Sequence, residues 1–143
     1  MELFTIGYEG RTLPQTVRLL RDQRVERLVD VRARPQSHKP GFSSLALFDG
    51  LRKAGITYES DRALGTPDDI RALWRAGDLV EGRARYRRLV RGPLRPRLEL
   101  LLAITSFERV CILCYEAEPT QCHRSVIAEE AQRLRPELLV HHL

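Results

Sequence analysis

A cysteine, a histidine and an arginine stand together near the carboxyl-terminal end of the sequence, at Cys122-His123-Arg124. The preceding Pro119 and Thr120 predict the start of a helix with Thr120 as its N-cap, which places Cys122 in the first turn. Free backbone N–H groups and the helix dipole lower the pKa of a thiol in that turn, and Arg124 adds positive charge. We expect Cys122 to be a nucleophile or redox centre. The alternative is that Cys122 is a small buried apolar residue and His123 a capping or solvent-exposed one.

A second thiol and a carboxylate precede this segment, at Cys114 and Glu116. Their side chains point the same way from a predicted strand, whereas Cys111 faces the opposite side, which argues against a redox pair or zinc knuckle from Cys111 and Cys114. The candidate catalytic residues are Cys122, His123, Glu116 and Cys114, with His123 or Glu116 moving protons. A metal site from Cys114, Cys122 and His123 is geometrically conceivable. It lacks a second C-x-x-C or an H-x-x-x-H, so we assign no metal ligand and keep metal binding as an alternative.

Polar and basic residues follow the other predicted strands, where ligands of open parallel sheets bind. Arginine holds phosphate or carboxylate groups through paired hydrogen bonds, so Arg32 and Arg124 are expected to bind an anion. The candidate residues for substrate or anion binding are Asp30, Arg32, Ser37, Tyr58, Arg124 and Tyr8. An internal ion pair between Asp30 and Arg32 or Arg124, which would fix the loops, is the other interpretation of the charged residues.

An arginine-rich segment spans residues 83–97, with seven arginines and no acidic residue. The net charge of the whole chain is +5, so the excess belongs to this segment. A basic helical face there could lie along nucleic-acid phosphates, through Arg83, Arg87, Arg88 and Arg91. A solvated helix face is the alternative. No helix-turn-helix, zinc-finger or RNA-recognition signature indicates sequence-specific binding.

The elements that must position these residues alternate along the chain. Short apolar runs predict strands at residues 3–6, 28–31, 56–58, 110–114 and 138–140. Helical patterns separate them, at residues 12–20, 43–54, 66–74, 83–92, 94–107 and 119–134. The alternation predicts an α/β fold, a single three-layer domain over residues 1–143, with a mostly parallel sheet of about 4–5 strands and helices on both faces.

The composition excludes several classes of protein. Hydrophobic residues make up 43% and charged residues 30% of the 143 residues, which is typical of a globular protein. Three cysteines at these spacings do not form a secreted disulfide framework, and no apolar run approaches the roughly 18 residues of a membrane span. We expect a cytoplasmic protein without a membrane partner or a signal peptide. No phosphate loop or dinucleotide fingerprint is present, so no cofactor is expected.

Several motifs occur in an order that resembles a known family. They are Thr5-Ile6-Gly7-Tyr8-Glu9-Gly10, Asp30-Val31-Arg32-x-x-Pro35-x-Ser37, Phe42, Gly55-Ile56-x-Tyr58, Leu64-Gly65, and Leu113-Cys114-x-Glu116 followed by Cys122-His123-Arg124. This set resembles the bacterial and archaeal domain of unknown function family 488. Departures are Tyr8, where many relatives have histidine, and Thr66, where a second glycine is usual. The resemblance implies a small α/β domain and no settled activity.

The strand-end residues together predict a pocket at the carboxyl edge of the sheet. The leading hypothesis is a thiol-dependent or anion-binding enzyme that acts on a small or phosphate-bearing substrate. A nucleic-acid-binding module that uses the arginine-rich segment is the first alternative, and a metal-binding protein is the second. The expected partners are therefore a small anionic ligand or nucleic acid.

Overall fold

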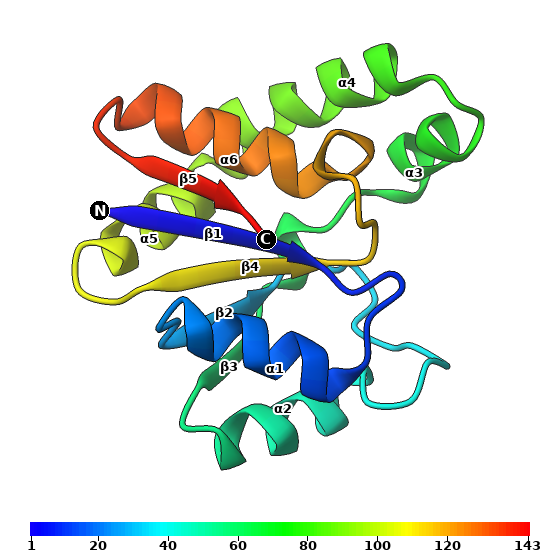
Figure 1. The fold of residues 1–143 in the computed structure, drawn as a ribbon. Helices are drawn as coiled ribbons and strands as arrows, with labels where there is room; N and C mark the ends of the chain where they lie inside the picture. Colours follow the sequence, from blue (N-terminus) through cyan, green and yellow to red (C-terminus); the bar gives the residue numbers. More distant parts are fainter.

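The computed structural model describes all 143 residues and contains one five-stranded sheet with the strand order β3-β2-β4-β1-β5 (Figure 1). Every pair of neighbouring strands is parallel. The strands are β1 (Glu2–Gly7), β2 (Arg27–Asp30), β3 (Thr57–Ser60), β4 (Val110–Cys114) and β5 (Leu139–His142). The predicted α/β fold with a parallel sheet is confirmed.

Helices cover both faces of the sheet. They are α1 (Leu13–Asp22), α2 (Ser44–Lys53), α3 (Asp68–Arg75), α4 (Leu79–Arg91), α5 (Arg95–Thr105) and α6 (His123–Leu134), with single 3₁₀ turns η1 (Arg62–Leu64) and η2 (Pro119–Gln121). In Figure 1, α1 and α2 lie on one face, whereas α4, α5 and α6 lie on the other. The chain moves outward in one direction from β1 to β3 and in the opposite direction from β3 to β5. Right-handed crossovers therefore place the two sets of helices on opposite faces. None of the helices combines the length and apolar character needed to cross a membrane.

Two apolar clusters form the core, one on each face of the sheet. Side chains alternate along β4, so Cys111 packs in the cluster under α1 and α2, while Cys114 packs in the cluster under α4, α5 and α6. The predicted divergence of these two thiols is confirmed.

The start of α6 differs from the sequence-based expectation. Glu118 accepts hydrogen bonds from the backbone and hydroxyl of Thr120, which closes η2 as a separate turn. The chain is then extended at Cys122, which is the N-cap of α6, and His123 is the first helical residue. Thr120 is therefore not the N-cap of the long helix, and Cys122 lies one residue before its first turn.

The sheet topology creates a crevice at the carboxyl end of β4. This strand lies between β1 and β2, whose connections run over one face, while its own connection through α6 runs over the other. Neighbouring strands with connections on opposite faces leave a gap beyond their carboxyl ends, which is where ligands bind in such sheets. The candidate site lies at this point.

Candidate active site at the carboxyl edge of the sheet

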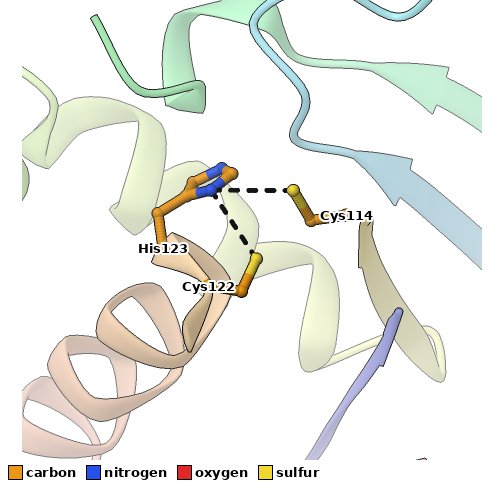
Figure 2. A group of neighbouring side chains, drawn as sticks. All are labelled: Cys114, Cys122 and His123. Carbon is orange, nitrogen blue, oxygen red and sulfur yellow. Dashed lines mark hydrogen bonds between the residues drawn. The ribbon is translucent and has the colours of Figure 1, made fainter. Parts of the chain in front are cut away.

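Two thiols and one imidazole meet at the carboxyl end of β4 (Figure 2). The Nδ1 atom of His123 lies 3.7 Å from the sulfur of Cys114 and 3.8 Å from the sulfur of Cys122. Cys114 is the last residue of β4, and the other two residues begin α6. All three side chains are buried. The fold therefore gives one nitrogen atom two sulfur neighbours.

The second ring nitrogen of His123 already makes a hydrogen bond within the protein. Its Nε2 atom lies 2.8 Å from the carbonyl oxygen of Val31, and a carbonyl oxygen only accepts hydrogen bonds. In the neutral imidazole Nε2 therefore carries the proton, and the lone pair of Nδ1 faces the thiols. The ring of Tyr86 packs edge-on against the imidazole, with centroids 5.3 Å apart, and its hydroxyl donates to the Leu64 carbonyl. The imidazole is thus held as an oriented proton acceptor.

Burial controls the protonation of Cys122. The side chain is 2% exposed, and burial raises its pKa well above the ordinary value, with a further rise from Cys114 and an opposing effect of His123. This direction is opposite to the predicted lowering, because desolvation outweighs the favourable position at the helix end. The resting thiol is protonated and needs a base to become a nucleophile.

The three residues line a cleft of about 950 Å³. All four candidate catalytic residues, Cys114, Glu116, Cys122 and His123, contribute to its walls. Of the six residues predicted to bind substrate, Tyr8 and Arg32 also line it. The cleft is of the size that commonly holds a small organic ligand.

Asp30 and Arg32 form a buried ion pair on the sheet face that carries α1 and α2. Nε and Nη2 of Arg32 donate to the carboxylate of Asp30 at 2.8 and 2.6 Å, and Nη1 donates to the Phe42 carbonyl and the Tyr8 hydroxyl at 2.8 and 3.1 Å. The hydroxyl of Tyr58 donates to Asp30 at 2.6 Å. Burial opposes the charge of Arg32, but Asp30 outweighs burial and raises the pKa of Arg32. The internal ion-pair interpretation therefore describes this group.

Arg124 is fully buried and holds the segment between β4 and α6. Its guanidinium donates to the Thr5 hydroxyl at 3.2 Å and to the carbonyl oxygens of Glu116 and Ala117. The same segment presses on Gly7 so closely that a Cβ there would lie 2.6 Å from the carbonyl carbon of Glu116. Arg124 therefore shapes the loop that carries Cys122 and does not line the cleft.

The three side-chain donors of the thiol cluster could also hold a metal ion. The ligand atoms of Cys114, Cys122 and His123 all lie within 4.8 Å of one another. Two thiolates and one imidazole suit zinc, and three protein ligands leave a fourth position for water or substrate. The Nε2–H of His123 on the Val31 carbonyl is the kind of second hydrogen bond that orients a metal-binding histidine.

Comparison with known proteins places the chain in a family. The family described as "Domain of unknown function DUF488" matches residues 12–131. The chain belongs to DUF488. No curated protein and no solved structure matches it. The matched range of this DUF488 chain includes the thiol cluster and most of the cleft, and the family description names no activity.

Ser37 in the DUF488 chain supports a loop and does not face the cleft. Its hydroxyl accepts a hydrogen bond from the backbone of Lys39 at 3.1 Å, and the Lys39 ammonium group donates to the Tyr8 carbonyl at 2.9 Å. The ring of Tyr8 stacks on Phe42 with centroids 4.4 Å apart. These contacts fix the segment that follows β2.

The arginine-rich face of α4 is paired with α6. Glu129 and Glu130, both on α6, receive the ion pairs of Arg83, Arg87 and Arg91. Arg88 lies 3.8 Å from Glu81 on its own helix. Burial opposes the charge of Glu130, but hydrogen bonds from Arg91 and Arg133 outweigh burial and lower the pKa of Glu130. Ion pairs with α6 therefore neutralise most of the positive face of α4 that the nucleic-acid hypothesis requires.

Sequence reasoning missed the basic residues of α3 that reach the DUF488 cleft. They are Arg71 and Arg75, with Trp74 beside them, and the cleft also includes Arg34 and His38 from the segment after β2. The spacing of Arg71 and Arg75 places them on one helical face, which is visible in the sequence. Nothing in the local pattern shows that α3 lies over the carboxyl edge of the sheet, so their position depends on the fold.

Proposed function

We propose that this DUF488 chain is a thiol-dependent enzyme that acts on a small anionic substrate. Cys122 is the nucleophile and His123 is the base in this proposal. The observation that supports it is the pair of 3.7 and 3.8 Å contacts from two sulfurs to Nδ1, made while Nε2 is occupied by the Val31 carbonyl. A thiol with an adjacent oriented base is the arrangement that nucleophilic catalysis requires.

The proposed reaction has two steps. Nδ1 of His123 accepts the proton of Cys122 as the sulfur attacks, a bond forms between sulfur and the substrate, and the leaving group departs with that proton. Water then attacks the covalent intermediate while Nδ1 accepts one of its protons, the bond between sulfur and substrate breaks, and the proton passes from Nδ1 to the released sulfur. The sulfur lies at the N-cap of α6, where the helix dipole stabilises developing negative charge. Glu116, on the cleft wall, stabilises the imidazolium.

Site-resolved alkylation with iodoacetamide tests the proposal. At neutral pH, His123→Gln should slow the modification of Cys122 by about 10²-fold, because the oriented base is lost. Cys111→Ala is the matched control, because Cys111 is fully buried in the other apolar cluster. This substitution should leave the alkylation rate of Cys122 unchanged. Equal rates in the wild type and His123→Gln, with both proteins folded by circular dichroism, would refute thiol activation.

A metal centre is the second candidate function, and the clustering of three ligand atoms within 4.8 Å favours it. It would use Cys114 and Cys122 as thiolates and His123 through Nδ1. Elemental analysis of protein purified without a tag tests this candidate. One equivalent of zinc that protects both thiols from alkylation until a chelator is added would support it, and metal-free protein with two reactive thiols would exclude it.

We also propose that the chain works as a single domain in the cytoplasm. All three cysteines are free, which suits a reducing compartment. Both apolar clusters share one sheet, which supports a single folding unit.

A further inference from the structure

The part of the cleft wall formed by α3 and the segment after β2 is basic. Arg71 and Arg75 lie one turn apart on α3, and Arg34 joins them from the segment after β2. Glu116 is the single carboxylate among the residues that line the cleft. The wall therefore attracts negative charge.

The charges of these arginines remain available to a ligand. Asp68 is their acidic neighbour, at 3.2 Å from Arg34 and 3.9 Å from Arg71, and its side chain is 76% exposed. Ion pairs this exposed contribute little, so a ligand can replace them at small cost. Arg32, in contrast, is committed to the fully buried Asp30.

A hydrogen-bond donor without a partner lies beside the same arginines. The Nε1 atom of Trp74 is buried and has no hydrogen-bond partner, and Trp74 lines the cleft together with Arg71 and Arg75 of the same helix. Buried polar groups are nearly always paired in folded proteins. A rotation of the indole that turns Nε1 towards the cleft would let an oxygen atom of a bound ligand accept this hydrogen bond, and the charged neighbours indicate that the oxygen is anionic.

We infer that the cleft binds the phosphoryl group of a small phosphate monoester through Arg71, Arg75 and Arg34, with Trp74 donating to one of its oxygens. This inference rests on the proposed function, because it names the substrate class of the same site. Guanidinium groups pair with phosphate oxygens in a forked geometry, and a dianion matches several arginines better than a single carboxylate does. A cleft of about 950 Å³ has room for an organic group that extends from the phosphate towards Cys122.

Calorimetric titration with phenyl phosphate tests this inference, with benzoate as a monoanionic probe that carries the same ring. The titration uses the Cys122→Ser chain, so that binding is measured without the proposed nucleophile. Phenyl phosphate should bind more tightly than benzoate, and Arg71→Ala with Arg75→Ala should weaken its binding about tenfold or more. The matched control is Arg18→Ala with Arg21→Ala, which removes the same charge from α1, away from the cleft. This control should not change the affinity.

The outcomes separate the substrate class from the catalytic proposal. If phenyl phosphate binding depends on Arg71 and Arg75 while the alkylation rate of the thiols does not depend on His123, the phosphate site is supported and the thiol enzyme is overturned. If His123 activates the thiols but the protein binds phenyl phosphate no better than benzoate, the phosphate site is overturned. Equal weakening by the two double variants also overturns it, since the attraction would then come from total charge.

Discussion

Replacing Asp30 by asparagine keeps the shape of the side chain and removes its charge. Asp30 is fully buried and accepts three hydrogen bonds from Arg32 and one from Tyr58. An amide offers one oxygen to these donors and turns its own N–H₂ towards the others. The guanidinium of Arg32, which is 6% exposed, keeps its charge without a counter-ion. Removing one partner of a buried pair costs about 3–5 kcal/mol, a large part of the roughly 5–15 kcal/mol that stabilises a typical domain.

Urea unfolding followed by circular dichroism measures this loss. Asp49→Asn is the control, because Asp49 is half exposed, pairs only with exposed Arg52 and Lys53, and should change nothing measurable. A second comparison combines Asp30→Asn with Arg32→Met. In the double variant the unpaired charge is gone, so Asp30→Asn with Arg32→Met should be more stable than Asp30→Asn alone. A loss below about 1 kcal/mol for Asp30→Asn, or a double variant that is less stable still, would refute the assignment of a structural ion pair.

Three further predictions follow from close contacts and shifted pKa values. Gly7→Ala should destabilise the protein by about 1–3 kcal/mol in thermal or urea unfolding, because the new Cβ overlaps the Glu116 carbonyl; an unchanged midpoint would contradict the packing of that loop. The alkylation rate of Cys122 should still rise above pH 9.0, since burial raises its pKa, and a plateau below pH 8 would contradict this. Glu130 has a lowered pKa in the folded state, so its ion pairs stabilise the protein above pH 4.5 and lose that effect as the pH falls through the lowered value. The stability deficit of Glu130→Gln should therefore be present at pH 7 and shrink in acid, as measured by unfolding at each pH.

The thiol cluster follows from patterns that the sequence already contains. The continuous apolar run Val110–Cys114 predicts a buried strand with the same bounds as β4. Side chains of a strand point alternately to its two faces, which separates Cys111 from Cys114. Parallel strands end at one edge, so a thiol at the end of β4 and a thiol at the start of the next helix meet there. Local periodicity and sheet topology were therefore sufficient for this part of the site.

The part of the basic wall that α3 contributes could not be predicted, because tertiary contacts decide which arginines are free. Two of the three hydrogen-bond partners of Arg124 are loop carbonyl oxygens, and a carbonyl group has no sequence signature. Arg71 and Arg75 reach the cleft because the long connection from β3 to β4 folds α3 over the sheet edge. The N-cap of α6 was misplaced for a related reason. Glu118 caps a short turn at Thr120, and the propensities of neighbouring residues do not show where one turn ends and the next helix begins.

The Val31 carbonyl gives strand register a direct influence on the chemistry of the site. The main-chain oxygen of residue 31 selects the tautomer of His123, so another apolar side chain at this position should preserve the base. The amino-acid sequence therefore does not reveal which group fixes the tautomer. A change in the register of β2, in contrast, would disturb the base. Val31 directly follows β2, and successive carbonyl groups of an extended chain point in opposite directions, so a slip of β2 by one residue would turn this oxygen away from Nε2. Both sulfurs and the imidazole would remain, but the lone pair of Nδ1 would no longer be fixed towards them. Proton transfer at this edge of the sheet therefore depends on the alignment of a strand that contributes no side chain to the thiol cluster.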